Sequence, residues 1–379
     1  MKLDHFVVER PVTSKKTDTG LLVSMVLLLG LGLLTLYFTS ADYGLRFHSG
    51  RNHFIKQQIF PVIIGLVCMT IMACINLELI RKLMPWILFG TLVLNVLPLI
   101  FSYEVNGSKR WLKIFSYTLQ PSDVAKLVIV LFLANLFDKK KDRINDVATS
   151  IAPAIIVLFL FVGIVILQND YATSMLILLL GLLLFFISGV SMRWFGAFLV
   201  FSVPIALIFI FVEKYRVDRL IAFLNPKYDI QGINYQVNAS KIAINAGGFW
   251  GQGMGTGLEK IKSIPEVHAD FVFAGWAEAM GFIGVIGYFA LLGYFAYKVF
   301  NIAAKCEDFF RSLLAFGCGA IIVVQSLVNC GVVCGALPST GIPLPFFSHG
   351  GTSMLMTLVT CGVIINISRY ENVSELMYE

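Results

Sequence analysis

The chain has 379 residues, of which 58% are hydrophobic and only 14% are charged, and its mean hydropathy is +0.81. A chain with so few charged groups cannot cover a water-soluble globule of this length, so the composition excludes a soluble enzyme and makes the bilayer the solvent. The formal net charge of +6 is scattered over the connections without a basic stripe, which argues against a nucleic-acid partner.

Apolar runs long enough to cross a bilayer, which takes roughly 20 helical residues, recur along the chain. They lie near 21–39, 59–77, 84–102, 121–137, 151–168, 171–190, 194–212, 270–300, 312–332 and 350–367. The sequence therefore predicts an all-α integral membrane protein of about ten transmembrane helices, with residues 1–379 forming a single membrane domain.

The distribution of Lys and Arg over the short connections predicts the orientation. These residues are more frequent in the terminal segments and the even-numbered connections than in the odd-numbered ones, and positive charge marks the cytoplasmic side. Both termini, including a tail of residues 1–20, are therefore expected in the cytoplasm.

The long connection at 213–269, between the seventh and eighth helices, is then extracytoplasmic. Its aromatic residues and a helix-like stretch at 236–246 indicate order, and loops of this length are commonly functional.

A glycine-rich segment lies within this long connection. Residues 247–257 contain six glycines, a composition that lets backbone N–H groups approach an anionic ligand. The segment lacks the Gly-Lys-Ser/Thr ending of a P-loop and the preceding strand of a dinucleotide fingerprint. A flexible surface or re-entrant turn explains the same composition.

His268 and Asp270 lie where the long connection meets the eighth helix. A carboxylate at this place, near the outer membrane surface, is consistent either with a catalytic base or with an ordinary helix cap. His268 is consistent with a base or with a hydrogen-bonded loop residue. The pattern of residues leaves both alternatives open.

Four ionisable residues fall inside or at the ends of apolar runs, where such groups are costly and usually face a cavity or a partner. They are Asp123, Lys126, Asp170 and Glu278. Asp123 and Lys126 are spaced i, i+3, so they either pair with each other or present charge to a substrate. In the connection before them, Arg110 flanks Trp111 and is either an interfacial anchor or an anion ligand.

Residues 337–351 contain three prolines and three glycines within an otherwise apolar stretch. A continuous helix is excluded there. Non-helical backbone at membrane depth is tolerated where protein buries it or where it lines a watery cavity. The stretch is therefore expected to be a re-entrant element beside a polar pocket.

Several of these segments, in this order, resemble the SEDS family (shape, elongation, division and sporulation) of FtsW and RodA, over nearly the whole chain. The matching stretches are residues 105–111 (VNGSKRW), 120–126 (QPSDVAK), 215–219 (YRVDR), 223–226 (FLNP), 235–236 (YQ), the glycine-rich segment, 265–271 (PEVHADF) and 348–351 (SHGG). The residues at 215–216 and in the glycine-rich segment are closer to FtsW. The chain departs from the family pattern at Asp123, usually Glu, at Asn169, usually Pro, at Ala279, usually Glu, and at His349, usually Tyr.

The resemblance implies a peptidoglycan glycosyltransferase of the bacterial cytoplasmic (inner) membrane that polymerises glycan strands from lipid II and undecaprenyl-linked glycan, in cell division or cell shape. It makes Asp270 the catalytic carboxylate. Substrate and pyrophosphate binding is expected from Arg110, Lys126, Arg216, Arg219, Gly251, Gly253, His268 and Ser348, and a structural polar core from Asp123, Asp170 and Glu278.

The resemblance also implies partners: a class B penicillin-binding protein that supplies the transpeptidase, divisome or elongasome proteins, and membrane lipid. No dedicated metal cage is evident, so a divalent cation, Mg or Mn, would be held mainly by substrate phosphates. Two other classes stay open: a flippase or transporter of lipid-linked precursor, with the buried charges as its relay, and a scaffold without activity.

Overall fold

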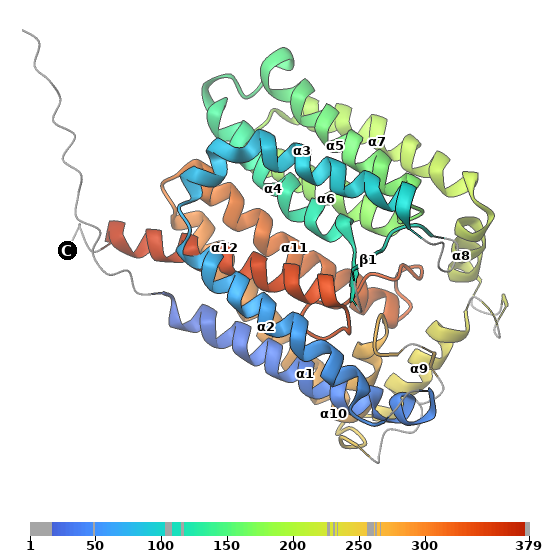
Figure 1. Ribbon diagram of the computed structural model, residues 1–379. Coiled ribbons are helices and arrows are strands. Elements are labelled where there is room, and N and C mark those ends of the chain that lie inside the picture. Colours follow the sequence, from blue (N-terminus) through green and yellow to red (C-terminus); the bar gives the residue numbers. More distant parts are fainter. Residues whose placement is uncertain are drawn as a thin grey trace, which may run out of the picture.

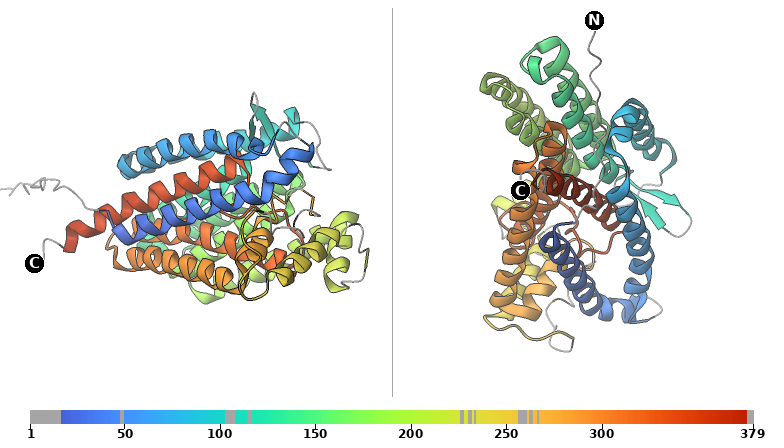
Figure 2. Two further views of the ribbon diagram at one scale, coloured as in Figure 1. Left: turned by 90° about the horizontal axis from the view of Figure 1, so that it is seen from below. Right: turned by 90° about the vertical axis from the view of Figure 1, so that its left-hand side faces the viewer.

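The computed structural model describes residues 17–47, 50–102, 108–114, 117–225, 228–229, 232, 234–255, 261, 264–265 and 267–375. Within this part of the chain, long helices lie side by side in one bundle (Figures 1 and 2). The helices α4, α11 and α12 run between α3, α5, α6 and α7 on one side and α1, α2 and α10 on the other. The short elements β1, α8 and α9 gather at one end of the bundle (Figure 1).

The helices and strands follow one another along the chain in this order. The first half contains α1 (Thr19–Phe47), α2 (His53–Cys74), α3 (Leu77–Phe101), β1 (Leu112–Ile114), β2 (Tyr117–Leu119), α4 (Pro121–Lys139), a 3₁₀ turn (Lys141–Arg143), a π-helical turn (Val147–Ile151) and α5 (Ala152–Leu167). The second half contains α6 (Tyr171–Ile187), α7 (Met192–Val212), α8 (Lys214–Leu224), α9 (Tyr235–Gly247), α10 (Val272–Lys305), α11 (Phe309–Val333) and α12 (Gly351–Glu375).

The predicted apolar runs all fall largely within helices of this bundle, which confirms an all-α membrane protein. Among the described residues, eight helical spans are long and apolar enough to cross a membrane by length and composition. These are α1, α2, α3, α5 with the turn before it, α7, α10, α11 and α12. The remaining two runs form α6, which is apolar but shorter, and α4, which carries Asp123, Lys126 and Asp138.

A small β-hairpin precedes α4 and was not predicted, because its strands have only three residues each. β1 and β2 pair antiparallel, with Lys113 opposite Thr118. The hydroxyl of Thr352, near the start of α12, donates to Thr118 O at 2.9 Å and accepts from Gln120 N at 3.0 Å. These bonds attach the hairpin to the end of the bundle where the long connection lies, and so position the residues just before the hairpin.

The described residues of the connection between α7 and α10 form two α-helices. The helix-like stretch predicted at 236–246 corresponds to α9, whereas α8 was not predicted. The buried amide of Asn234 donates to Ala222 O at 2.8 Å and to Tyr228 O at 3.0 Å, which ties the end of α8 to the start of α9.

The helix α10 is broken at Gly281, although the sequence predicted a continuous apolar helix. Gly281 has φ +61° and ψ −162°, a region that is essentially restricted to glycine. The glycine-rich segment fills the break: the N–H groups of Gln252 and Gly253 donate to Glu278 O and Ala279 O at 2.9 and 3.0 Å. On the other side of the break, the N–H groups of residues 282 and 283 donate to the carbonyl oxygens of residues 248 and 249. Backbone groups that a broken helix would leave unpaired are thereby satisfied.

Gly281→Ala is therefore expected to destabilise the protein. The backbone strain alone costs about 1–3 kcal/mol, and the added Cβ would collide with the backbone nitrogen of Gly251. Equilibrium unfolding in SDS and detergent mixtures measures the loss. Gly287→Ala is the matched control, because a Cβ there meets open space in the same helix. Equal stability of the two variants would contradict this role for Gly281.

Residues 334–350 are non-helical, as predicted, and enter the protein between α1, α10 and α11. Phe346 and Phe347 are fully buried. Phe347 packs edge-on against Trp276 and Tyr288 of α10. On α1, Gly32 lies against the carbonyl of Phe346, and a side chain there would collide with it. Protein therefore buries this irregular backbone, as its position in a membrane bundle requires.

Candidate active site

Asp270 lies in the turn just before α10 and is partly exposed. The N-cap of α10 is Phe271, and within the described residues it has no side-chain capping bond. Asp270 therefore lies one residue before the N-cap position of α10.

A buried amide on α11 fixes the backbone of Asp270. Asn329 Nδ2 donates to Asp270 O and to Ile342 O, both at 2.8 Å. One turn earlier, Gln325 Nε2 donates to Pro343 O at 2.9 Å. These two side chains, spaced i, i+4 on one face of α11, thus hold the start of α10 and the 334–350 segment together.

The carboxylate of Asp270 faces the 334–350 segment and a cation from α8. A Cβ built on Gly341 would lie 3.3 Å from Asp270 Oδ2, so this glycine lets the backbone approach the carboxylate closely. Arg219 Nη1 donates to Ser339 O at 3.1 Å, two residues away. Loss of hydration lowers the pKa of the Arg219 guanidinium, Arg110 lowers it further, and Asp270 raises it. Arg219 therefore lies within electrostatic range of both Arg110 and Asp270.

Arg110 comes from the connection before the hairpin and is anchored by Asp170. Arg110 Nη1 lies 3.3 Å from Asp170 Oδ1, and its guanidinium stacks 4.2 Å from the centre of the Trp111 ring. The buried Asp170 also accepts from Gln120 Nε2 at 2.8 Å and from Ser122 Oγ at 3.2 Å. Among the described residues, the buried Nε of Arg110 has no acceptor. Asp170 and the Trp111 ring therefore hold the Arg110 guanidinium in place.

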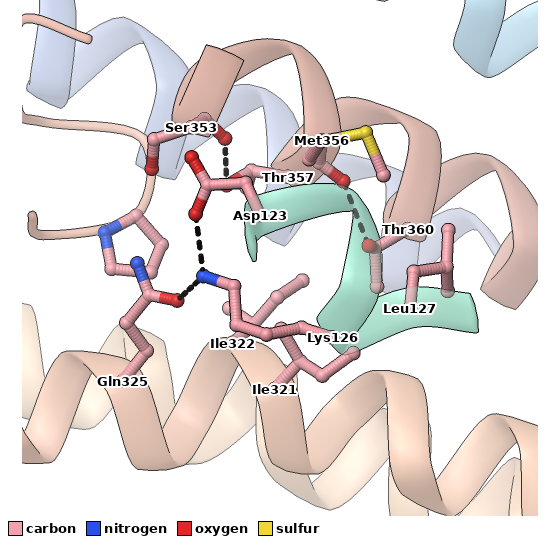
Figure 3. Close-up of a pocket in the computed structure, with 11 residues that line it drawn as sticks. Asp123, Lys126, Leu127, Ile321, Ile322, Gln325, Ser353, Met356, Thr357 and Thr360 are labelled. Atoms are coloured by element: carbon pink, nitrogen blue, oxygen red, sulfur yellow. Dashed lines mark hydrogen bonds and ion pairs between the residues drawn. The ribbon is translucent and has the colours of Figure 1, made fainter. Parts of the chain in front are cut away.

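Asp123 and Lys126 form an ion pair inside the bundle. Their side chains are 4% and 6% exposed, and Lys126 Nζ lies 2.8 Å from Asp123 Oδ1. The same ammonium donates to Gln325 Oε1 at 2.7 Å. The three side chains line a hollow between α4, α11 and α12 that Pro345 of the 334–350 segment also lines (Figure 3). Lys126 therefore bonds to side chains of its own chain, whereas the resemblance implied that it binds pyrophosphate.

Arg216 is likewise used within the protein. It is 7% exposed. Its guanidinium donates to Phe209 O at 2.8 Å, to Asn169 Oδ1 at 3.2 Å and to the Tyr215 hydroxyl at 3.0 Å. These bonds join α7, α8 and the start of α6. The structure thus gives Arg216 a role in joining these helices, and its anion-binding role stays a prediction.

Ser348 and His268 are both buried and contact other parts of the protein. The buried Ser348 hydroxyl accepts from Leu344 N at 2.7 Å, which closes a turn of the 334–350 segment. The buried His268 ring stacks 4.0 Å from the ring centre of Phe54, and His268 O accepts from His349 N at 2.8 Å. Loss of hydration, with a smaller effect of His53, lowers the pKa of His349 to about 4, so His349 is neutral at pH 7.

The glycines predicted to bind pyrophosphate donate their N–H groups to carbonyl oxygens of the protein itself. Gly251 N donates to Gly247 O at 2.8 Å, and Gly253 N donates to Ala279 O in the break of α10. Glu278 is buried on the same turn of α10, where Oε2 accepts from Ile261 N at 2.8 Å. The glycine-rich segment therefore braces α10, and its predicted ligand-binding role is not supported by this geometry.

Sequence reasoning missed three polar residues that border the site: Asn329 and Gln325 on α11 and Lys241 on α9. The signal for the first two was present, since two amides at i, i+4 in an apolar run mark a buried polar face. Lys241 gave no signal, because one lysine on a loop helix resembles ordinary surface charge. Among the described residues, no group of three or more His, Cys, Asp or Glu side chains is placed to hold a metal ion.

Similar proteins cover almost the entire chain. It is 32% identical over 365 residues to the probable peptidoglycan glycosyltransferase FtsW of Trichlorobacter lovleyi, covering 96% of each chain. It is 32% identical over 373 residues to the protein of the same name of Bacillus subtilis, covering 95% of this chain and 93% of that one.

Solved structures share the fold. A chain from a study of the structural coordination of polymerization and crosslinking by a peptidoglycan synthase complex superposes with a TM-score of 0.76 and 25% identity, covering 93% of this chain and 98% of that one. The Thermus thermophilus rod shape determining protein RodA superposes with a TM-score of 0.69 and 24% identity, covering 93% and 97%. The FtsW/RodA/SpoVE family of cell cycle proteins matches residues 19–373, and the chain therefore belongs to this family.

Proposed function

We propose that this chain is a peptidoglycan glycosyltransferase that polymerises lipid II during cell division, with Asp270 as general base. The relatives named above are probable peptidoglycan glycosyltransferases of the FtsW type, which supports the reaction class and the division role. The observation that carries the proposal for the site is the partly exposed carboxylate of Asp270 within electrostatic range of Arg219, which is itself within range of Arg110. A base that accepts the proton and cations that neutralise the departing pyrophosphate suit this reaction.

In the proposed reaction, the ionised Asp270 accepts the proton of the acceptor sugar's 4-hydroxyl. The hydroxyl oxygen forms a bond to C1 of the donor sugar as the bond from C1 to the pyrophosphate oxygen breaks. Undecaprenyl pyrophosphate leaves with the bonding electron pair, and the proton passes from Asp270 to solvent. A positioned base typically contributes about 10²- to 10⁴-fold to such a step.

Arg219 and Arg110 stabilise the departing pyrophosphate. Fixed cations aimed at developing negative charge lower the barrier without reorganising. Lys126 and Arg216 are held by the protein, so they support the site instead of binding the anion. A divalent cation, Mg or Mn, would draw most of its ligands from the substrate phosphates and would help to neutralise them.

The proposed reaction takes place on the outer side of a bacterial cytoplasmic membrane. Both termini are cytoplasmic, and the connection between α7 and α10 faces outward, as the distribution of positive charge favours. Glycan strands must also be cross-linked. A class B penicillin-binding protein supplies the transpeptidase, consistent with the likeness to a chain of a peptidoglycan synthase complex. Divisome proteins recruit the pair.

Precursor flipping is the second candidate, favoured by the ion pair of Asp123 and Lys126 beside a hollow inside the bundle. At the opposite end of the bundle from Asp270, however, Arg81 contacts Asp138 and donates to Asn135 Oδ1 at 3.3 Å, which binds α3 to α4. These contacts hold α3 and α4 together at that end of the bundle.

Proteoliposomes that contain the chain and its transpeptidase partner separate the two functions. Lipid II is supplied in the outer leaflet of vesicles that also carry an impermeant reagent for inner-leaflet precursor. The proposal expects glycan polymer without transfer of precursor between leaflets. Transfer without polymer would overturn it in favour of the flippase.

A further inference from the structure

A second cavity lies between α8, α9 and the 334–350 segment. Its empty volume, counted together with the open solvent at its mouth, is about 330 Å³. It is lined by Arg219, Ala222, Phe223, Asn234, Val237, Asn238, Lys241, Gly335, Leu337, Pro338 and Ser339. Two cations and two amides thus share one cavity with apolar walls.

Lys241 is directed at the turn that follows α11. Its Cε and Nζ lie so close to Gly335 that a Cβ there would collide with them, and Gly335 has φ +72°. A larger residue at 335 would therefore displace the ammonium. Among the described residues, no Asp or Glu lines the cavity. The positive charges of Lys241 and Arg219 consequently have no carboxylate from the cavity wall to neutralise them.

Arg219 forms the wall between this cavity and the catalytic carboxylate. Its guanidinium donates to Ser339 O, and Gly341, two residues further along the chain, lies against Asp270. A sugar at Asp270 would therefore place its substituents within reach of the cavity. The apolar side chains of Val237, Leu337 and Pro338 suit methyl groups better than they suit a bare phosphate.

We propose that this cavity binds the peptide of the lipid-linked precursor, with Lys241 as the ligand of a peptide carboxylate. The inference rests on the proposed function, which supplies a disaccharide-peptide substrate. Lys241 and Asn238 meet the polar end of the peptide, and the apolar wall meets its alanyl methyl groups. Lys241 thereby recognises the peptide without taking part in the glycosyl transfer.

Cys334 offers a readout that does not depend on activity. This exposed cysteine precedes Gly335. Loss of hydration raises the pKa of its thiol, and the charge of Lys241 lowers it, so the two groups are close. With Cys68, Cys74 and Cys306 changed to Ser, Cys334 is the remaining accessible thiol among the described cysteines. Its alkylation by a maleimide reports on the charge and occupancy of the cavity.

The experiment measures alkylation of Cys334 in the full chain with three probes: the disaccharide-pentapeptide without its lipid, the same disaccharide without peptide, and inorganic pyrophosphate. The expected result is that only the peptide-bearing probe slows alkylation. Lys241→Met should weaken that protection by about tenfold or more, and should shift the alkylation profile to higher pH. Lys241→Arg should retain the protection, and Lys214→Met on α8 should leave it unchanged.

Two outcomes would overturn the inference: protection by pyrophosphate or by the peptide-free disaccharide alone, or full protection in Lys241→Met. Asp270→Asn separates this test from that of the proposed function, because protection should persist in a variant that makes no polymer. If wild type forms polymer and Lys241→Met shows an unchanged KM for lipid II, the peptide site fails while the polymerase assignment stands. If the peptide-bearing probe protects Cys334 but the wild type forms no polymer, the polymerase assignment fails while the peptide site stands.

Discussion

Asp270→Asn is expected to lower the rate of glycan polymerisation by roughly 10²- to 10⁴-fold. The amide is nearly the same size as the carboxylate but cannot accept the proton of the acceptor hydroxyl. The backbone of residue 270 stays fixed by Asn329, so the change removes the base without moving the loop. Polymer formed from lipid II by the purified chain with its transpeptidase partner, separated by length on a gel, measures the rate.

Asp142→Asn is the control, since this exposed carboxylate lies in the turn after α4. It should polymerise at the wild-type rate. Binding of lipid II to Asp270→Asn should also be retained, which separates loss of chemistry from loss of substrate. Polymerisation by Asp270→Asn at more than a tenth of the wild-type rate would exclude Asp270 as the base.

Lys126→Met is expected to destabilise the protein by about 3–5 kcal/mol, because it leaves Asp123 buried without its counter-charge. The methionine preserves the length of the side chain, so the loss comes from charge and not from a cavity. Equilibrium unfolding in SDS and detergent mixtures measures the change. The double variant Asp123→Asn and Lys126→Met should recover most of the stability, because it removes both charges together.

Lys139→Met, at the exposed end of the same helix, should change stability by no more than about 0.5 kcal/mol. The double variant also tests what Lys126 does for catalysis. If the double variant regains both stability and polymerisation, Lys126 affects catalysis only by stabilising the helix bundle. If stability returns without polymerisation, the ammonium contributes to the reaction. A single variant as stable as wild type would contradict a buried, paired role.

The apolar runs predicted the long helices, since burial in lipid demands the same apolar composition whatever the bundle's contacts. The non-helical stretch at 334–350 was also predictable, because proline removes the hydrogen bonds of a helix. The motifs at 215–219 and 265–271 indicated Arg219 and Asp270, and the structure brings these two residues within electrostatic range. Both kinds of prediction depend on local sequence.

Features set by long-range contact were not predictable in the same way. The break at Gly281 exists because backbone groups of residues 248–253 replace its helical bonds, and no local pattern reveals such an exchange. Arg216 and Lys126 carry the charge that a pyrophosphate site requires, but in the structure Arg216 donates to Asn169, and Lys126 pairs with Asp123 and donates to Gln325. Sequence gives the chemistry of a side chain, whereas its partners come from the packing of the helices.

The insertion of the glycine-rich segment into α10 has a consequence for biosynthesis. Residues 248–253 leave the ribosome before residues 278–283, yet each set completes the other's backbone bonds. The glycine-rich segment must therefore wait, without its final backbone partners, until the following helix has been translated. The part of the molecule that carries Asp270 therefore reaches its final structure only after α10 has been synthesised.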